Sequence, residues 1–203
     1  MKRLLIVVVC CALGCTAPPN ESVVNSPEAD HTYVLDSLLD YDSEQELINR
    51  FGKENIGRDT AWLPEGMGQY MVTVLYPGTK NEVALSWLDS ASYMGLDEIR
   101  VSADSSEWIS KGVRIGTPMS ELVLLNGSHF TFSGFDWDYG GYTSWGEDGR
   151  LRGLTVRLRS SEAMMAQEQL DSLIGDRTVL SRSTAARLNN PVVSEMRLLK
   201  ERE

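Results

Sequence analysis

The side chains best suited to chemistry gather in one short segment, Gly134–Gly149. Its sixteen residues include five aromatic residues, four acids and five glycines. Aromatic rings stack on sugar faces or on partner side chains, and carboxylates accept hydrogen bonds from hydroxyl or ammonium groups. The composition therefore predicts a surface that binds a glycan or a protein. The candidate binding residues in this segment are Asp136, Trp137, Asp138, Tyr139, Tyr142 and Trp145.

Other interpretations of the same segment stay open. Aromatic residues at positions 135, 137 and 139 alternate with Asp136 and Asp138, which also indicates a core strand with one solvated face, followed by a turn at Glu147–Gly149. The two aspartates match in type the general acid and base of a glycosidase. With Glu147 they offer the oxygen ligands that calcium prefers. Of these interpretations, the core strand and turn fit the pattern best.

A second group of aromatic residues lies earlier in the chain, where Trp62 and Tyr70 flank a loop that contains Pro and Gly. If this loop and the later segment leave the same face of a sheet, these two residues form one concave aromatic patch with Trp137, Tyr142 and Trp145. The alternative is that the rings are buried. We favour burial, because five tryptophans are ordinary for a core of this size.

The usual catalytic and metal-binding motifs are absent from the sequence. His31 and His129 are far apart, and the three cysteines all lie within the first fifteen residues, so a zinc site would need carboxylates around a single imidazole. The sequence contains no Gly-x-Ser-x-Gly elbow, phosphate-binding loop or dinucleotide fingerprint. We therefore expect a protein that is not an enzyme and that binds no metal and no cofactor.

Composition and charge narrow the class of partner. The 203 residues are 42% hydrophobic and 24% charged, as in ordinary globular proteins, and the length allows one large or two small domains. Asp and Glu number 29 against 19 Lys and Arg, which gives a net charge of −10. Because such a surface repels phosphate backbones, we expect no nucleic-acid partner.

The first residues have the pattern of an export signal. Lys2 and Arg3 precede an apolar run, Leu4–Leu13, which as a helix is roughly 15 Å long and too short to span a bilayer. The run ends in Ala-Leu-Gly-Cys15, which resembles the cleavage box of bacterial lipoproteins. This resemblance implies a signal peptide over 1–14 and lipid on Cys15; a plain signal peptide cut near Gly14 is the alternative. Residues 15–32, rich in Pro, Ser, Asn and acids, predict a flexible tether.

The folded part is predicted to be α+β, with short helices packed on an antiparallel sheet and two related units, 33–110 and 111–203, in tandem. Capping residues bound helices over 43–52 and 117–127, with Thr117 as the cap of the second, and apolar spacing predicts a third over 162–174. Alternating patterns predict strands over 71–76, 83–87, 99–103, 130–135, 154–158, 178–180 and 192–199. A shift of 75 residues superposes Glu46 on Glu121, Leu47 on Leu122, Gly52 on Gly127 and Trp62 on Trp137.

Two family resemblances follow from these motifs. Gly116, Leu122 and Gly127 have the spacing of the signature helix of BamE/SmpA-type outer-membrane lipoproteins and of the β-lactamase-inhibitor-like fold, whose members carry the unit in tandem. The runs 125–141, 175–177 and 190–192 look like those of a group of uncharacterised bacterial envelope lipoproteins. Both resemblances imply a helix-and-sheet fold in the cell envelope. The first also implies the outer membrane, where we expect the protein to face the periplasm.

The sequence therefore leads to one main functional expectation and two alternatives. The main expectation is a non-enzymatic protein, held to the membrane by lipid on Cys15, that binds a protein partner or serves in assembly. The first alternative is a lipoprotein that binds or weakly processes glycans through the segment 134–149. The second is an inhibitor of an envelope enzyme, which the tandem fold suggests.

Overall fold

The computed structural model describes residues 33–63, 67–161 and 163–201. The expected signal peptide, the tether and the lipid site at Cys15 lie outside these residues. The described part begins with two short helices, the 3-10 helix η1 (Leu35–Asp40) and α1 (Glu44–Phe51). All of the folded part, Thr32–Glu203, forms one compact unit.

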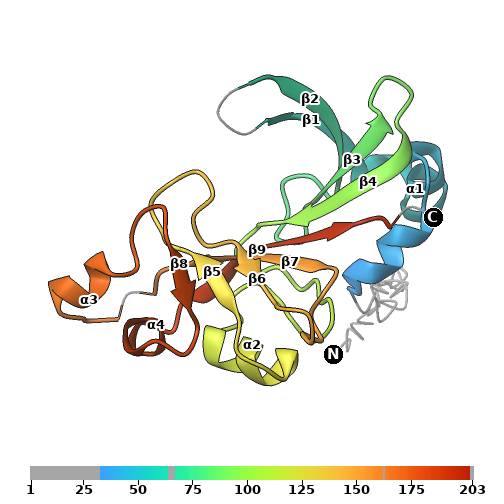
Figure 1. Ribbon diagram of the computed structural model, residues 1–203. Coiled ribbons are helices and arrows are strands. Elements are labelled where there is room, and N and C mark those ends of the chain that lie inside the picture. Colours follow the sequence, from blue (N-terminus) through green and yellow to red (C-terminus); the bar gives the residue numbers. More distant parts are fainter. Residues whose placement is uncertain (1–32, 64–66, 162, 202–203) are drawn as a thin grey trace, which may run out of the picture. The chain divides into compact units, whose positions relative to one another are not determined.

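The centre of this unit is a six-stranded antiparallel sheet in the order β1-β2-β3-β4-β9-β7 (Figure 1). Its strands are β1 (Ile56–Trp62), β2 (Gln69–Leu75), β3 (Val83–Asp89), β4 (Met94–Val101), β7 (Leu154–Arg159) and β9 (Val192–Leu199). The strand β9 lies between β4 and β7, so both halves of the sequence contribute to one sheet. The predicted α+β fold is confirmed, and the relation of the two halves by duplication stays a prediction.

A smaller three-stranded sheet, β6-β5-β8, lies beside the large one. Its strands are β5 (Thr131–Ser133), β6 (Thr143–Ser144) and β8 (Thr178–Leu180). The remaining helices are η2 (Lys53–Asn55), α2 (Met119–Asn126), α3 (Gln167–Asp171) and α4 (Thr184–Asn189).

The large sheet has one core face and one polar face, as the alternation of its strands requires. Leu85, Ile99 and Met196 are completely buried on the core face. Helices η1, α1 and α2 contribute buried leucines to the same core cluster, so they lie on that side of the sheet. The opposite face carries only a small apolar cluster at one end, made of Ala61, Val72 and Val74 with Tyr70 and Ala84 packed against it.

The helices follow their predicted signals closely in one case and less closely in two. Ser43 caps α1 as expected, since its hydroxyl accepts the Glu46 N–H at 3.3 Å. The cap of α2 is Pro118 and not Thr117, whose hydroxyl accepts the Arg114 N–H instead. The third helix spans only Gln167–Asp171. The predicted helix over 163–166 and its continuation to 174 are wrong. Residues 163–166 are not helical, and after Asp171 the chain makes tighter i→i+3 bonds, from the Leu173 N–H to the carbonyl of residue 170 at 2.8 Å and from the Ile174 N–H to that of Asp171 at 3.4 Å.

A buried carboxylate fixes α1 against the sheet. Glu44 is 7% exposed and accepts hydrogen bonds from Arg58, at 2.7 and 3.2 Å, and from the Thr73 hydroxyl at 2.7 Å. The Trp87 indole N–H donates to the same hydroxyl at 2.9 Å. Burial raises the pKa of Glu44, but the bonds from Arg58 and Thr73 outweigh it, so the pKa lies below the usual value of a glutamate.

We expect Glu44→Gln to lower the free energy of unfolding by about 2 kcal/mol at neutral pH, because a charge-assisted bond to a buried hydroxyl is lost. Since the folded pKa is depressed, the contribution of Glu44 is present above its unfolded pKa and is lost as the pH falls through the folded pKa. Urea unfolding at pH 7 and at pH 3 measures both effects. The exposed Glu54→Gln is the control. A variant E44Q as stable as the wild type at pH 7 would contradict this role.

Candidate functional site

The polar face of the large sheet gathers charged side chains from its last three strands. Glu98 and Arg100 lie on β4, Glu195 and Arg197 on β9, and Arg157 on β7. Each is next in sequence to a buried core residue, so its side chain leaves the opposite face of the sheet. Arg100 lies directly opposite Arg197 in the register, and Glu195 lies opposite Arg157. Long-range strand pairing therefore assembles a compact group of ionic side chains.

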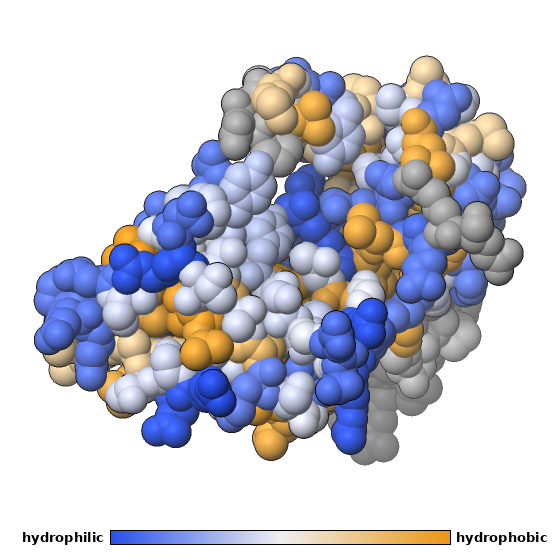
Figure 2. Space-filling view, in the orientation of Figure 1, coloured by the Kyte–Doolittle hydropathy of each residue, from blue (hydrophilic) through white to orange (hydrophobic). Residues whose placement is uncertain are grey.

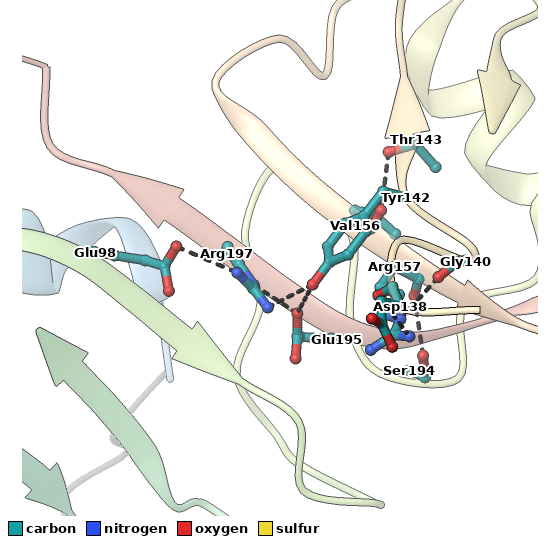
Figure 3. A network of polar contacts seen from close by, with 10 residues as sticks. All are labelled: Glu98, Asp138, Gly140, Tyr142, Thr143, Val156, Arg157, Ser194, Glu195 and Arg197. Atoms are coloured by element: carbon teal, nitrogen blue, oxygen red, sulfur yellow. Dashed lines mark hydrogen bonds and ion pairs between the residues drawn. The ribbon is translucent and has the colours of Figure 1, made fainter. Parts of the chain in front are cut away.

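Arg197 is the centre of this group, as Figure 3 shows. Its Nε donates to Glu195 Oε1 at 2.5 Å, and its Nη1 lies 3.6 Å from Glu98 Oε2. A second terminal nitrogen donates to the hydroxyl of Tyr142, which in turn donates to Glu195 Oε1 at 3.1 Å. The side chains of Arg197, Glu195 and Glu98 are 26%, 13% and 18% exposed. Because this network is largely shielded from water, it holds its members in fixed positions.

Burial and neighbouring charges shift the pKa values of three members of the network. Burial raises the pKa of Tyr142, and the charge of Glu195 raises it further. Burial lowers the pKa of Arg197, but its hydrogen bond to Glu195 and the nearby carboxylates raise it above the usual value. Burial also raises the pKa of Glu98, while Arg197 and Arg100 oppose that effect. These shifts favour the neutral form of Tyr142 and the charged form of Arg197.

The loop 134–142 folds over the end of the sheet that carries this network. The strand β5 ends at Ser133, and the chain returns so that the Gly141 N–H donates to the Ser133 carbonyl at 2.9 Å. The Leu158 N–H on β7 donates to the Gly141 carbonyl at 2.8 Å. Arg157 donates to two further loop carbonyls, those of residues 140 and 138, at 2.8 and 3.4 Å. The core strand predicted over 135–139 is therefore wrong. These residues lie in a loop, in which the carbonyl groups of residues 138 and 140 accept hydrogen bonds from the Arg157 side chain and not from a neighbouring strand.

Two adjoining cavities open on the polar face. The first, about 430 Å³, is lined by Trp137, Asp136 and Arg157 among others, and the second, about 280 Å³, lies over the apolar cluster of β1, β2 and β3. Ser102 and Glu195 line both cavities, so they form the wall between them. Figure 2 shows this face hollowed, with strongly hydrophilic side chains inside the hollow. The cavities and the network together are the candidate site.

The predicted aromatic residues fall into different environments. Trp137 is half-buried, donates its indole N–H to the Gly134 carbonyl at 2.8 Å and packs edge-on against Tyr139 with centroids 5.4 Å apart. Tyr139 is 40% exposed. Tyr142 belongs to the ionic network. Trp145 lies in the core, 6% exposed, against Phe130, and its indole N–H donates to the Leu154 carbonyl at 2.6 Å.

The single aromatic patch of five rings is therefore wrong, and the favoured burial of these rings is correct for Trp145 and wrong for Trp62. Trp145 is a core residue, and neither cavity is lined by Trp62 or Tyr70. Trp62 is 65% exposed at the end of β1, next to the pair Ala61 and Tyr70. Asp136 lines the first cavity, whereas Asp138 contributes only its backbone carbonyl to the Arg157 contact.

Sequence reasoning missed the acids and arginines of β4 and β9. Their signal is the alternation of charge with apolar residues in Glu98-Ile99-Arg100 and Glu195-Met196-Arg197. This pattern is normally that of a solvated strand face. Only the pairing of β4 with β9, whose sequences are about a hundred residues apart, turns the two patterns into one network.

The described residues contain no cluster suited to a metal. Within 33–63, 67–161 and 163–201, no group of three His, Cys, Asp or Glu side chains is placed to hold an ion. His129 is exposed, and its Nδ1 lies 3.3 Å from the Ser181 hydroxyl, which also accepts the Phe130 N–H. In the same part of the chain, no helix has the length and apolarity needed to cross a membrane.

Comparison with known proteins gives little further information. No protein-family description and no curated protein matches the sequence. Among solved structures, the chain is similar to the crystal structure of the uncharacterized protein YfeY from Escherichia coli. The two are 12% identical, the match covers 77% of this chain and 88% of the other, and the TM-score is 0.38. A similarity at this level assigns neither a family nor an activity.

Proposed function

We propose that the chain is a lipid-anchored protein of the bacterial cell envelope that binds another protein without catalysis. The polar face of the six-stranded sheet is its contact surface. One observation carries the proposal: two adjoining cavities on this face share Ser102 and Glu195, and the second of these residues is held in a half-buried ionic network. Preordered side chains around a hollow lower the entropic cost of binding.

Location is proposed from the sequence. The box that ends at Cys15 and the resemblance to BamE/SmpA-type and other envelope lipoproteins support attachment to the outer membrane, facing the periplasm. Acylation by two or more chains is enough for stable attachment. The environment of the network supports a binding role, since it favours the neutral form of Tyr142 and the charged form of Arg197.

Affinity capture from membranes tests the proposal. The full chain is the bait. Ser102→Trp is the test variant, because Ser102 lines both cavities and a tryptophan at this position would occupy space in them. Ser120→Trp, on the exposed side of α2, is the matched control. We expect a protein that the wild type and S120W retain equally and that S102W loses by tenfold or more. A set of captured proteins that is identical for all three baits would rule out this face as the contact surface.

A glycan ligand is the second candidate, favoured by one observation. Trp137 and Asp136 line the first cavity together, which is the combination of an aromatic platform and a carboxylate acceptor that sugars require. Cosedimentation with insoluble cell-wall glycan tests it. If the ligand is a glycan, we expect the wild type to bind. Trp137→Ala should abolish this binding, and Trp62→Ala should leave it unchanged.

A further inference from the structure

Arg100 differs from the other arginines on the polar face. Arg197 pairs with Glu195 and Glu98, Arg157 donates to loop carbonyls, and Arg159 lies 3.6 Å from Asp104. The guanidinium of Arg100 makes no hydrogen bond and no ion pair within 4 Å with any residue in the described part of the chain, although its charge opposes the rise that burial causes in the pKa of Glu98. It is nevertheless half-buried and lines the second cavity. A guanidinium with five donors in a hollow, without an acceptor, favours an anionic ligand.

The apolar side chains that line the second cavity are small. Val72 and Val74 are 4% and 6% exposed, and they lie outside the main core. Ala84 lies directly opposite both Val74 and Arg100 in the strand register, so its short side chain leaves space beside the guanidinium. The volume of about 280 Å³ fits a small aliphatic group together with one carboxylate.

The acids around the cavity restrict the charge of the ligand. Asp59 and Glu82 also line it, and each already accepts a backbone N–H at 2.7 Å, from Thr60 and Gly78 respectively. These carboxylates would repel a phosphate, which carries up to two charges, more strongly than a single carboxylate. Glu195 lines the cavity as well, so among anionic ligands a monoanion held directly on Arg100 is repelled least.

Ser102 and Glu195, which separate the two cavities, offer polar atoms along which a longer ligand can extend from one cavity to the other. The hydrogen bonds of Glu195 all go to Oε1, so within the described residues its Oε2 makes none, and the same is true of the Ser102 hydroxyl. An extended peptide has N–H and C=O groups to pair with these atoms. Its preceding residues would continue past them into the first cavity, along Trp137.

We infer that the second cavity binds the C-terminal residue of the protein partner, with the terminal carboxylate on Arg100 and a small aliphatic side chain on Val72, Val74 and Ala84. This inference rests on the proposed function, because it names the part of the partner that the sheet face recognises. The residues before the C-terminus lie across Ser102 and Glu195.

Fluorescence anisotropy with the full chain tests the inference. The probe is a fluorescein-labelled pool of pentapeptides, degenerate at the first four positions and ending in valine with a free carboxylate. We expect saturable binding that falls about tenfold or more when the pool is C-terminally amidated, or when Arg100→Gln or Ala84→Leu is introduced. Arg182→Gln, an exposed arginine outside the face, is the control and should bind normally. Circular dichroism checks that the variants fold.

Competition separates the possible sources of the carboxylate. N-acetyl-valine should compete only weakly, because it lacks the residues that cross Ser102 and Glu195, and inorganic phosphate should not compete. Equal binding of the free and amidated pools, or no effect of R100Q, would overturn the inference. So would competition by N-acetyl-valine at the concentration of the peptide, or by phosphate. If the peptide pool does not bind while S102W still abolishes capture of a membrane protein, the inferred ligand class is wrong and the proposed binding face is supported. If the pool does not bind and S102W also leaves capture unchanged, both the inference and the proposed function are wrong.

Discussion

Gly141→Ala is expected to lower the free energy of unfolding by about 3 kcal/mol. Gly141 has a φ of +85°, a conformation that L side chains rarely adopt, and a Cβ at this position would lie 2.1 Å from the Leu158 carbonyl oxygen. The substitution therefore adds backbone strain to a backbone clash. It acts where the loop 134–142 bonds to β7, so we also expect the loop to separate from the sheet. Urea unfolding followed by tryptophan fluorescence measures the loss.

Gly146→Ala is the matched control for this prediction. Gly146 has a similar φ of +77°, but nothing lies within 4 Å of the position that its Cβ would occupy. Its substitution should cost only the backbone strain, about 1 kcal/mol. The difference between the two variants isolates the close approach of the loop to β7. Equal losses in G141A and G146A would show that this approach does not stabilise the fold.

Cys15→Ser is expected to abolish lipid attachment. The sequence predicts that Cys15 carries the acyl chains, and a serine there cannot form the thioether that begins the modification. Metabolic labelling with a palmitate analogue should mark the wild type and leave C15S at background. When C15S is exported from a cleavable leader without a lipoprotein box, it should move from the membrane pellet to the soluble fraction.

Cys11→Ser provides the control, since Cys11 lies in the same apolar segment but before the predicted cleavage point. It should be labelled like the wild type. If C15S is still labelled, or if both variants lose the label, the predicted lipid anchor at Cys15 is contradicted, and so is the proposed location. The binding face is tested separately by S102W and would not be affected.

Local signals predicted much of the secondary structure. The Ser43 cap and Gly52 bound α1 where the structure has it, and the alternating patterns of β3, β7 and β9 lie within two residues of the observed strands. The strand β1 was not predicted, because its residues are mostly exposed and lack alternation. The strand β1 is held in place by pairing with β2, through seven consecutive residue pairs. Here tertiary pairing decides what local propensity does not.

The candidate site was predictable only in part. Trp137 and Asp136 do line a cavity, as their residue types indicated, and Tyr142 lies in the polar network. Trp145 is a core residue because β6 passes beside β7, which a single sequence does not reveal. Arg100 has no distinguishing sequence signal. Its place beside Ala84, which in turn pairs with Val74, depends on a strand register that only the folded sheet reveals.

The position of β9 has a consequence for how the chain folds. Because residues 192–199 insert between β4 and β7, the sheet stays in two pieces until these residues are present. Contacts between segments so far apart in sequence slow folding, since a large loop must close before they form. The strands β1 to β4 should therefore gain protection from hydrogen exchange late, together with β7 and β9, and a fragment ending before β9 should be trapped as a partly ordered, aggregation-prone intermediate.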